Sequence, residues 1–238
     1  RKKAEAGEAP AQAELGWKYD SGDGVPQDRI AAVKWYRQAA EQGNAFAQYI
    51  LGWMYANGDG VPQDRAAAVK WYRQAAEQGH AVAQSNLGVS YANGDGVPQD
   101  SSAAVKWYRQ AAEQGYAVAQ FNLGVKYDNG EGVPPDRIKA VKWYFRAAEQ
   151  GLAIAQYNLA VRYANGDGIP RDNTAAVKWY RQAAEQGIAV AQYNLAVMYG
   201  RGEGVPPDLV QAHAWCSLAG TNGDETARKT LAMVEKVM

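Results

Sequence analysis

A block of 36 residues recurs through almost the whole chain, and this period is the feature that most constrains the fold. One proline keeps the spacing in every copy: Pro26, Pro62, Pro98, Pro134, Pro170 and Pro206. One tryptophan does the same: Trp35, Trp71, Trp107, Trp143, Trp179 and Trp215. A repeat of this length is typical of a solenoid, in which each unit packs only against its neighbours. Solenoids provide extended binding surfaces, so the period favours binding over catalysis.

The first half of each unit has the pattern of an amphipathic helix. In the third copy, Ala83, Leu87 and Tyr91 are spaced by four residues, which places them on one face of a helix. Asn93 and Gly94 follow, and both residue types tolerate the left-handed conformation that ends many helices. We therefore expect a first helix, called helix A, that stops at this point.

The second half of each unit predicts another helix. Asp100 stands where a carboxylate can accept hydrogen bonds from the first free N–H groups of a helix. Residues 101–114 carry the helical pattern, and Gly115 ends it. Each unit is thus helix A, a loop, helix B and a tight turn. Two antiparallel helices per unit, without a strand signal, predict an all-α fold, an α-solenoid.

One position in helix A accepts only very small residues. Glycine occupies it in the first four copies and alanine in the last two: Gly16, Gly52, Gly88, Gly124, Ala160 and Ala196. Alanine would be unfavourable if the position required a positive φ. The pattern therefore predicts a close contact with a neighbouring helix at this position.

The repeats fill the chain from end to end. We expect a single repeat domain over residues 1–238, with a capping helix at 224–238. The expected repeats are 9–44, 45–80, 81–116, 117–152, 153–188 and 189–224. The last helix keeps Ala227 and Leu231 in register but adds Arg228 and Lys229, and a polar outer face suits the end of an array.

Composition excludes several classes of protein. Lys plus Arg equals Asp plus Glu at 25 each, whereas a nucleic-acid-binding protein usually has a clear basic excess. Cys216 is the only cysteine, so no internal disulfide can form. No apolar run approaches the ~20 residues of a membrane-spanning helix. The chain starts at Arg1 without a methionine, which is consistent with a signal peptide removed upstream.

These residues form a longer motif that resembles a known family. It reads Ala83-Gln84-x-Asn86-Leu87-Gly88-x-x-Tyr91-x-x-Gly94-x-Gly96-Val97-Pro98-x-Asp100, then Ala104-Val105-Lys106-Trp107-Tyr108-x-x-Ala111-Ala112-Glu113-Gln114-Gly115. The motif is similar to the Sel-1-like repeat, a relative of the tetratricopeptide repeats. The resemblance implies a right-handed α/α superhelix with a concave face lined mainly by A helices. It also implies a scaffold or adaptor role, and a bacterial protein that is periplasmic or secreted. The cysteine pairs of some bacterial members are lacking here.

Positions that differ between the copies are candidates for partner binding, because constant positions are explained by packing. In the third copy the variable residues Ser85, Asn86, Val89 and Ser90 are expected opposite the core stripe of helix A. Asparagine can donate and accept hydrogen bonds along an extended peptide, and aromatic residues supply rigid contact area. The predicted partner-binding residues are Asn86, Asn122, Asn158, Asn194, Tyr49, Phe121, Tyr157, Tyr193, Trp53, Met54, Lys126 and Arg162.

A structural role competes with this interpretation. The asparagines could instead tie adjacent helices together, and the aromatic residues could fill gaps between repeats. A basic stripe on helix B, which includes Lys106 and Arg109, is interpreted as a solvated face that Glu113 partly neutralises. The loop acids suggest calcium only weakly, because the second acid of each pair is already explained as a helix cap.

The remaining reactive residues do not form a catalytic set. His80 and His213 lie in distant repeats, and Cys216 replaces a packing tyrosine of helix B. The sequence has no nucleophile elbow, phosphate-binding loop or metal-ligand spacing. We therefore expect no catalytic residue, no metal and no cofactor.

The sequence thus predicts a non-enzymatic scaffold that binds a peptide or a partner protein on its concave A-helix face. We expect a monomer that binds no nucleic acid and has no transmembrane segment. Two alternatives remain open: a spacer in envelope or exopolysaccharide assembly, and a cell-wall or polysaccharide hydrolase, which would need a pair of carboxylates.

Overall fold

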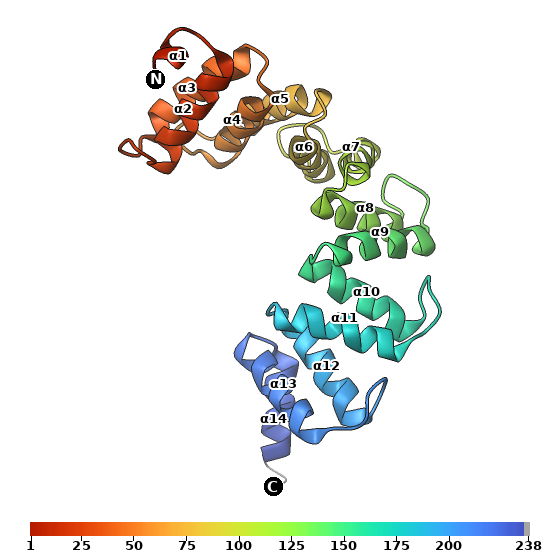
Figure 1. Ribbon diagram of the computed structural model, residues 1–238. Coiled ribbons are helices and arrows are strands. Elements are labelled where there is room, and N and C mark those ends of the chain that lie inside the picture. Colours follow the sequence, from red (N-terminus) through yellow and green to blue (C-terminus); the bar gives the residue numbers. More distant parts are fainter. Residues whose placement is uncertain (236–238) are drawn as a thin grey trace. The chain divides into compact units, whose positions relative to one another are not determined.

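Figure 1 shows the computed structural model, which describes residues 1–235. Within these residues the chain forms 14 helices and no strand. The helices are α1 (Lys2–Glu5), α2 (Ala9–Ser21), α3 (Arg29–Glu41), α4 (Ala45–Asn57), α5 (Arg65–Glu77), α6 (Ala81–Asn93), α7 (Ser101–Glu113), α8 (Ala117–Asn129), α9 (Arg137–Glu149), α10 (Ala153–Asn165), α11 (Asn173–Glu185), α12 (Ala189–Arg201), α13 (Leu209–Thr221) and α14 (Glu225–Glu235). The predicted all-α solenoid of helix pairs is confirmed.

The helices group into two compact units. The first comprises residues Arg1–Ala119 and Glu131–Val133, and the second comprises Gln120–Gly130 and the residues from Pro134 onward. In the first unit, consecutive helices from α1 to α7 contact one another in chain order. In the second unit, consecutive helices from α9 to α14 do the same. The predicted capping helix corresponds to α14, and its residues 236–238 lie outside the described part.

The helix ends follow the sequence signals. The Asp100 carboxylate accepts hydrogen bonds from the backbone N–H groups of Ser102 at 2.9 Å and Ala103 at 3.0 Å. Asp28, Asp64, Asp136, Asp172 and Asp208 cap the other B helices in the same way. Gly94 ends α6 in the left-handed conformation, with φ of +79°. Local capping therefore fixes where each helix begins and ends.

Each repeat buries small aliphatic residues together with one tyrosine. In the third repeat, Ala83 and Leu87 of α6 are fully buried, and so are Ala104 and Val105 of α7. Tyr108 supplies the large side chain of this core. Tyr91, the third residue of the predicted core stripe, is only half-buried. Because α6 packs against both α5 and α7, its buried surface extends beyond a single stripe.

A ladder of buried glutamines links successive helix pairs. The Gln84 side chain donates to the carbonyl oxygen of Ala76 at the end of α5, at 3.0 Å, and accepts from Gln114 at 2.7 Å. The same donation to a carbonyl eight residues earlier is made by Gln12, Gln48, Gln156 and Gln192. These bonds satisfy carbonyl groups that the end of a helix leaves without an internal partner. This ladder was not predicted from the sequence.

The loop between the two helices of a repeat packs against the preceding repeat. Gly96 has a φ of +74°, and a Cβ atom at this position would overlap the carbonyl oxygen of Arg65. The neighbouring Asp95 forms an ion pair with the Arg65 guanidinium. Glycine is needed here for both the conformation and the close approach of the two backbones.

None of the helices in the described residues has both the length and the apolar character needed to span a bilayer.

Candidate functional site in the grooves between repeats

A groove forms where the two helices of one repeat meet helix A of the next repeat. In the first unit, α4, α5 and α6 make such a groove, and the Tyr72 ring forms its floor. A Cβ atom on Gly52 would lie 2.7 Å from Cδ1 of Tyr72, so the ring rests directly on the backbone of α4. This confirms the close contact predicted for the small position of helix A. Burial raises the pKa of the Tyr72 hydroxyl to about 12.

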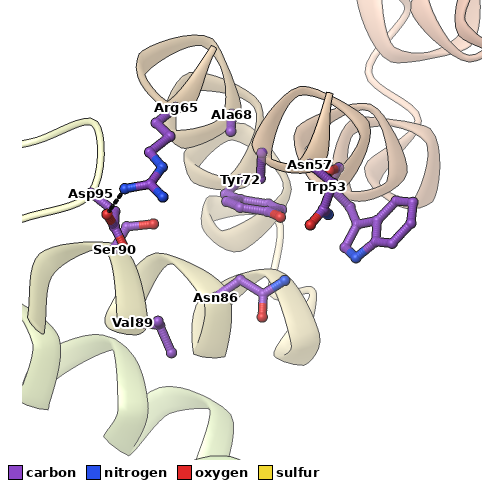
Figure 2. Close-up of a pocket in the computed structure, with 10 residues that line it drawn as sticks. Trp53, Asn57, Arg65, Ala68, Tyr72, Asn86, Val89, Ser90 and Asp95 are labelled. Atoms are coloured by element: carbon purple, nitrogen blue, oxygen red, sulfur yellow. Dashed lines mark hydrogen bonds and ion pairs between the residues drawn. The ribbon is translucent and has the colours of Figure 1, made fainter. Parts of the chain in front are cut away.

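This groove contains an open cavity of about 280 Å³ (Figure 2). Figure 2 shows the Tyr72 ring in the middle, the Trp53 indole on one side, and the Arg65–Asp95 ion pair on the other. Trp53 is 41% exposed, and the half-buried Asn86 contributes an amide from α6. The cavity therefore combines an aromatic floor with hydrogen-bonding and charged groups at its edge.

The cavity is open because Ser90 is small. In the second and sixth repeats the same position of helix A carries Met54, which is fully buried, and Met198, which is 5% exposed. Lys126 at this position is also buried. Met54 and Lys126, which were predicted to contact a partner, are thus buried in this structure, and their contact with a partner stays a prediction. Ser90 faces α5, the B helix of the preceding repeat, and the side chain at this position determines how far the groove there is filled.

Arg162 occupies this position in the second unit and is engaged in ion pairs. Its guanidinium pairs with Asp128 of α8 and with Asp167 in the loop after α10. The Tyr144 hydroxyl donates to Asp128 at 3.1 Å, and Arg137 pairs with Asp167 at 2.9 Å. The Arg162 and Asp128 side chains are only 17% and 11% exposed. Arg162 was predicted to contact a partner, but the structure uses it to fill a groove with a buried ion-pair network.

The asparagine ladder is half-buried and stays accessible from solvent. Asn86, Asn122, Asn158 and Asn194 occupy equivalent positions on α6, α8, α10 and α12. Two of them also serve the structure, because Asn86 hydrogen-bonds the Tyr72 side chain and Asn194 hydrogen-bonds that of Tyr180. The Asn158 amide donates to the carbonyl of Ile154 at 2.8 Å. These contacts support the structural interpretation, and because the amides are only half-buried, partner binding by the ladder stays a prediction.

The aromatic residues of helix A lie over the buried tyrosine of helix B in the same repeat. The ring centroids of Tyr49 and Tyr72 are 6.3 Å apart, and those of Tyr157 and Tyr180 are 6.1 Å apart. Phe121 makes the same contact with Tyr144 at 5.7 Å. Phe121, Tyr49, Tyr157 and Tyr193 are half-buried, so they both fill the repeat and contribute to its surface.

Several charged groups of the loops and of helix B have structural partners. Among the loop acids, Asp59 pairs with Arg29 at 2.9 Å and thereby connects two repeats. On the basic stripe of helix B, Arg37 donates to the Tyr55 hydroxyl of the next helix A at 2.6 Å, and Arg73 repeats this contact with Tyr91. The described residues contain no group of three or more His, Cys, Asp and Glu side chains that could hold a metal ion.

Of the two histidines singled out from the sequence, His80 lies in the first unit, whereas His213 lies on α13 and lines the same pocket as Cys216. His80 caps α6, with its Nδ1 accepting from the Ala83 backbone at 3.2 Å, and burial lowers its pKa. Cys216 is buried on α13, and burial raises the pKa of its thiol. Its sulfur donates weakly to the Ala227 carbonyl of α14 at 3.6 Å. These contacts give His80 and Cys216 structural roles.

Repeated helix pairs whose grooves differ only in a few side chains define an α-solenoid protein. The sequence of every pair matches the model of the Sel1 repeat, over residues 9–44, 45–80, 81–116, 117–152, 153–188 and 189–224. The chain therefore belongs to the Sel1 repeat family. Sel1 repeat proteins are generally non-catalytic scaffolds that mediate protein interactions.

Solved structures agree with this assignment. A protective antigen of uropathogenic Escherichia coli strains is 43% identical, with a TM-score of 0.94 over 98% of this chain, which spans 50% of that protein. A Sel1 repeat protein from Oxalobacter formigenes is 39% identical, with a TM-score of 0.79, and the match covers 89% of this chain and 85% of that one. An immunity protein from Pseudomonas aeruginosa shares the fold at 21% identity and a TM-score of 0.51, over 90% of this chain and 81% of that one. No curated protein matches the chain.

Proposed function

We propose that this protein is a non-enzymatic scaffold whose A helices bind a segment of a partner protein, anchored in the open groove between α4, α5 and α6. The cavity above Tyr72, open because Ser90 is small, is the observation that carries this proposal. A cavity of about 280 Å³ suits a side chain of a bound segment more than a whole domain.

The groups around this cavity suit a polypeptide ligand. The exposed Trp53 indole offers rigid apolar contact area of the kind found at the centre of protein interfaces. The Asn86 amide can donate to a backbone carbonyl and accept from a backbone N–H group. The Arg65–Asp95 ion pair lies at the other side, where polar groups of a bound segment could contact it.

In the second unit, Asn122, Asn158 and Asn194 repeat the position of Asn86 on three successive A helices. A segment that crosses these helices would meet one amide per repeat. This spacing favours an extended peptide as the ligand of that unit, and the half-burial of the amides would hold them in fixed orientations.

The carboxylates near the grooves are consistent with binding and disfavour the hydrolase alternative. Asp95 is ion-paired with Arg65, and Asp64 caps α5 by accepting from the Ala67 backbone at 2.9 Å. Asp128 is paired with Arg162. A glycoside hydrolase needs two carboxylates free to act as acid and as base or nucleophile.

The proposal is tested by filling the cavity with a residue that the same position already carries elsewhere. Short peptides are selected on the wild-type protein from a displayed random library, and their affinities are measured by calorimetry. Ser90→Met should weaken the peptides by about tenfold or more, because an excluded apolar side chain loses roughly 1.5–3 kcal/mol of burial. Ser102→Met, on the exposed surface of α7, is the matched control and should leave affinity unchanged.

A second variant tests the asparagine ladder. Replacing Asn122, Asn158 and Asn194 together with alanine should weaken peptides that bind the second unit, while circular dichroism and the melting temperature show a folded protein. Equal affinity of all selected peptides for wild type, Ser90→Met and the triple variant would rule out binding through the A helices.

A further inference from the structure

The groove at the end of the sixth repeat differs from all the others in its floor. Five B helices place a buried tyrosine there: Tyr36, Tyr72, Tyr108, Tyr144 and Tyr180. In α13 the equivalent residue is Cys216, which is far smaller. The structure has a pocket of about 580 Å³ at this place, between α12, α13 and α14. It has about twice the volume of the cavity above Tyr72.

The walls of this pocket are mainly apolar. Ala196 and Val197 of α12 lie on one side, and Leu231 of α14 lies on another. Leu209 and Val210 of α13 line its edge and are 76% and 77% exposed. At the position of Leu209, the groove above Tyr72 has Arg65, which is ion-paired. The edge of this pocket is therefore apolar and exposed at the position where the cavity above Tyr72 has a charged side chain.

The other repeats show what fills this place. In the second repeat the Tyr72 ring stacks against Tyr49, with a ring-plane angle of 29°. In the fifth repeat Tyr180 packs against Tyr157, and Ala160 occupies the position equivalent to Ala196. Tyr193 lines the pocket at the position of Tyr49 and Tyr157, but Cys216 offers it no ring. The space that Cys216 leaves empty in the sixth repeat is therefore the space that a tyrosine ring fills in the second and fifth repeats.

We propose that this C-terminal pocket binds an aromatic side chain of a partner polypeptide, which takes the place of the missing tyrosine. The inference rests on the proposed scaffold function but concerns a different groove. An apolar cavity of about 150 Å³ suffices for benzene, so a phenol or benzyl ring has room here. Leu209 and Val210 provide apolar contact for residues on either side of the inserted ring. Aromatic anchors in such pockets dominate many protein interfaces.

The test uses p-cresol, which is the tyrosine side chain without its backbone. In NMR titrations of the whole chain, p-cresol should shift backbone amides of α12, α13 and α14 in a saturable manner. Cys216→Tyr restores the residue of the other five repeats and should abolish these shifts. Ala214→Tyr adds the same ring at an exposed position of α13 and should leave them intact. If Cys216→Tyr does not fold, Val197→Trp closes the pocket from α12 with the residue that position 53 carries, and it should have the same effect.

Two capped tripeptides then distinguish a side chain from a free small molecule. Acetyl-Gly-Tyr-Gly-amide should shift the same amides, at least about tenfold more tightly than acetyl-Gly-Leu-Gly-amide. Binding of p-cresol without binding of the tyrosine peptide would overturn the polypeptide source, and binding that persists in the filled variants would overturn the site. The two proposals can fail separately. If Ser90→Met loses peptide affinity but p-cresol does not bind at Cys216, the proposed function is supported and only the C-terminal pocket is refuted.

Discussion

The ring of Tyr72 lies directly against the backbone of Gly52, so that a Cβ atom on residue 52 would come within 2.7 Å of Cδ1 of the ring. The equivalent tyrosines contact Gly16, Gly88 and Gly124 in the same way. In the fifth repeat Ala160 occupies the equivalent position, and it is fully buried. This contact sets the distance between the two helices of a repeat and the level of the groove floor above them.

A larger side chain at position 52 should therefore separate α4 from α5. We expect Gly52→Val to lower the free energy of unfolding by about 1–3 kcal/mol through overpacking, measured by urea titration. Gly200→Val is the matched control, because its nearest neighbour is the Ala212 Cβ at an ordinary 3.7 Å. Equal losses for the two variants would show that helix propensity, and not the Tyr72 contact, sets the cost.

The glutamine ladder should contribute to stability in each repeat. We expect Gln84→Leu to lower the free energy of unfolding by about 1–3 kcal/mol, because the buried Ala76 carbonyl and the Gln114 amide both lose a partner. Gln110→Leu makes the same change at a half-buried position outside the ladder. Chemical denaturation of both variants measures the difference, and a loss no greater than that of the control would contradict a role for the ladder.

Removing one partner of the Asp128–Arg162 ion pair should lower the stability of the fold more than replacing both partners. Arg162→Met leaves a buried carboxylate without its guanidinium, and we expect it to cost about 3–5 kcal/mol of stability. The double variant Asp128→Ala with Arg162→Met recreates the combination of Ala164 and Met198 in the next groove, and it should recover most of the loss. A double-mutant cycle in urea gives the coupling energy. A double variant as unstable as Arg162→Met would refute this explanation.

Protonation of His80 should destabilise the fold in acid. Burial lowers the pKa of His80 in the folded protein, so the unfolded chain takes up its proton first as the pH falls. The stability due to the neutral ring is present above the unfolded pKa of about 6.5 and is lost as the pH falls through the lower folded value. His80→Asn, which carries the cap that Asn44 provides for α4, should remove this part of the pH dependence of the melting temperature. Identical profiles for the two proteins between neutral pH and pH 5 would contradict the prediction.

Local signals in the sequence predicted most of the fold. Asp100 and Gly94 act on the backbone next to them, so residue type and position in the sequence were enough to predict their capping roles. The smallness of residues 52 and 160 predicted a close contact, because no local conformation explains it. The glutamine ladder was missed, since a bond from Gln84 to Ala76 depends on how consecutive helices cross.

The candidate site was harder to predict, because helix A is buried on two sides. A single stripe through Ala83 and Leu87 placed Ser85 and Ser90 on the free side, yet both are buried, at 2% and 8% exposure. Ser85 lies toward the B helix of its own repeat, as its counterpart Tyr49 does, and Ser90 lies toward the B helix of the preceding one. Variation between copies at position 90 therefore reflects how each groove is filled. The sequence did signal the C-terminal pocket, through the exchange of tyrosine for Cys216, but its size required the structure.

Binding of partners through the A helices can be tested by photo-crosslinking. A photoreactive phenylalanine is placed either at position 53, beside the open groove, or at position 70, on the exposed basic stripe of α5. Each protein is irradiated with a peptide that was selected on the wild type. Binding through the A helices predicts efficient crosslinking from position 53 and only background crosslinking from position 70. Crosslinking from position 70 alone would place the partner on the B helices and contradict it.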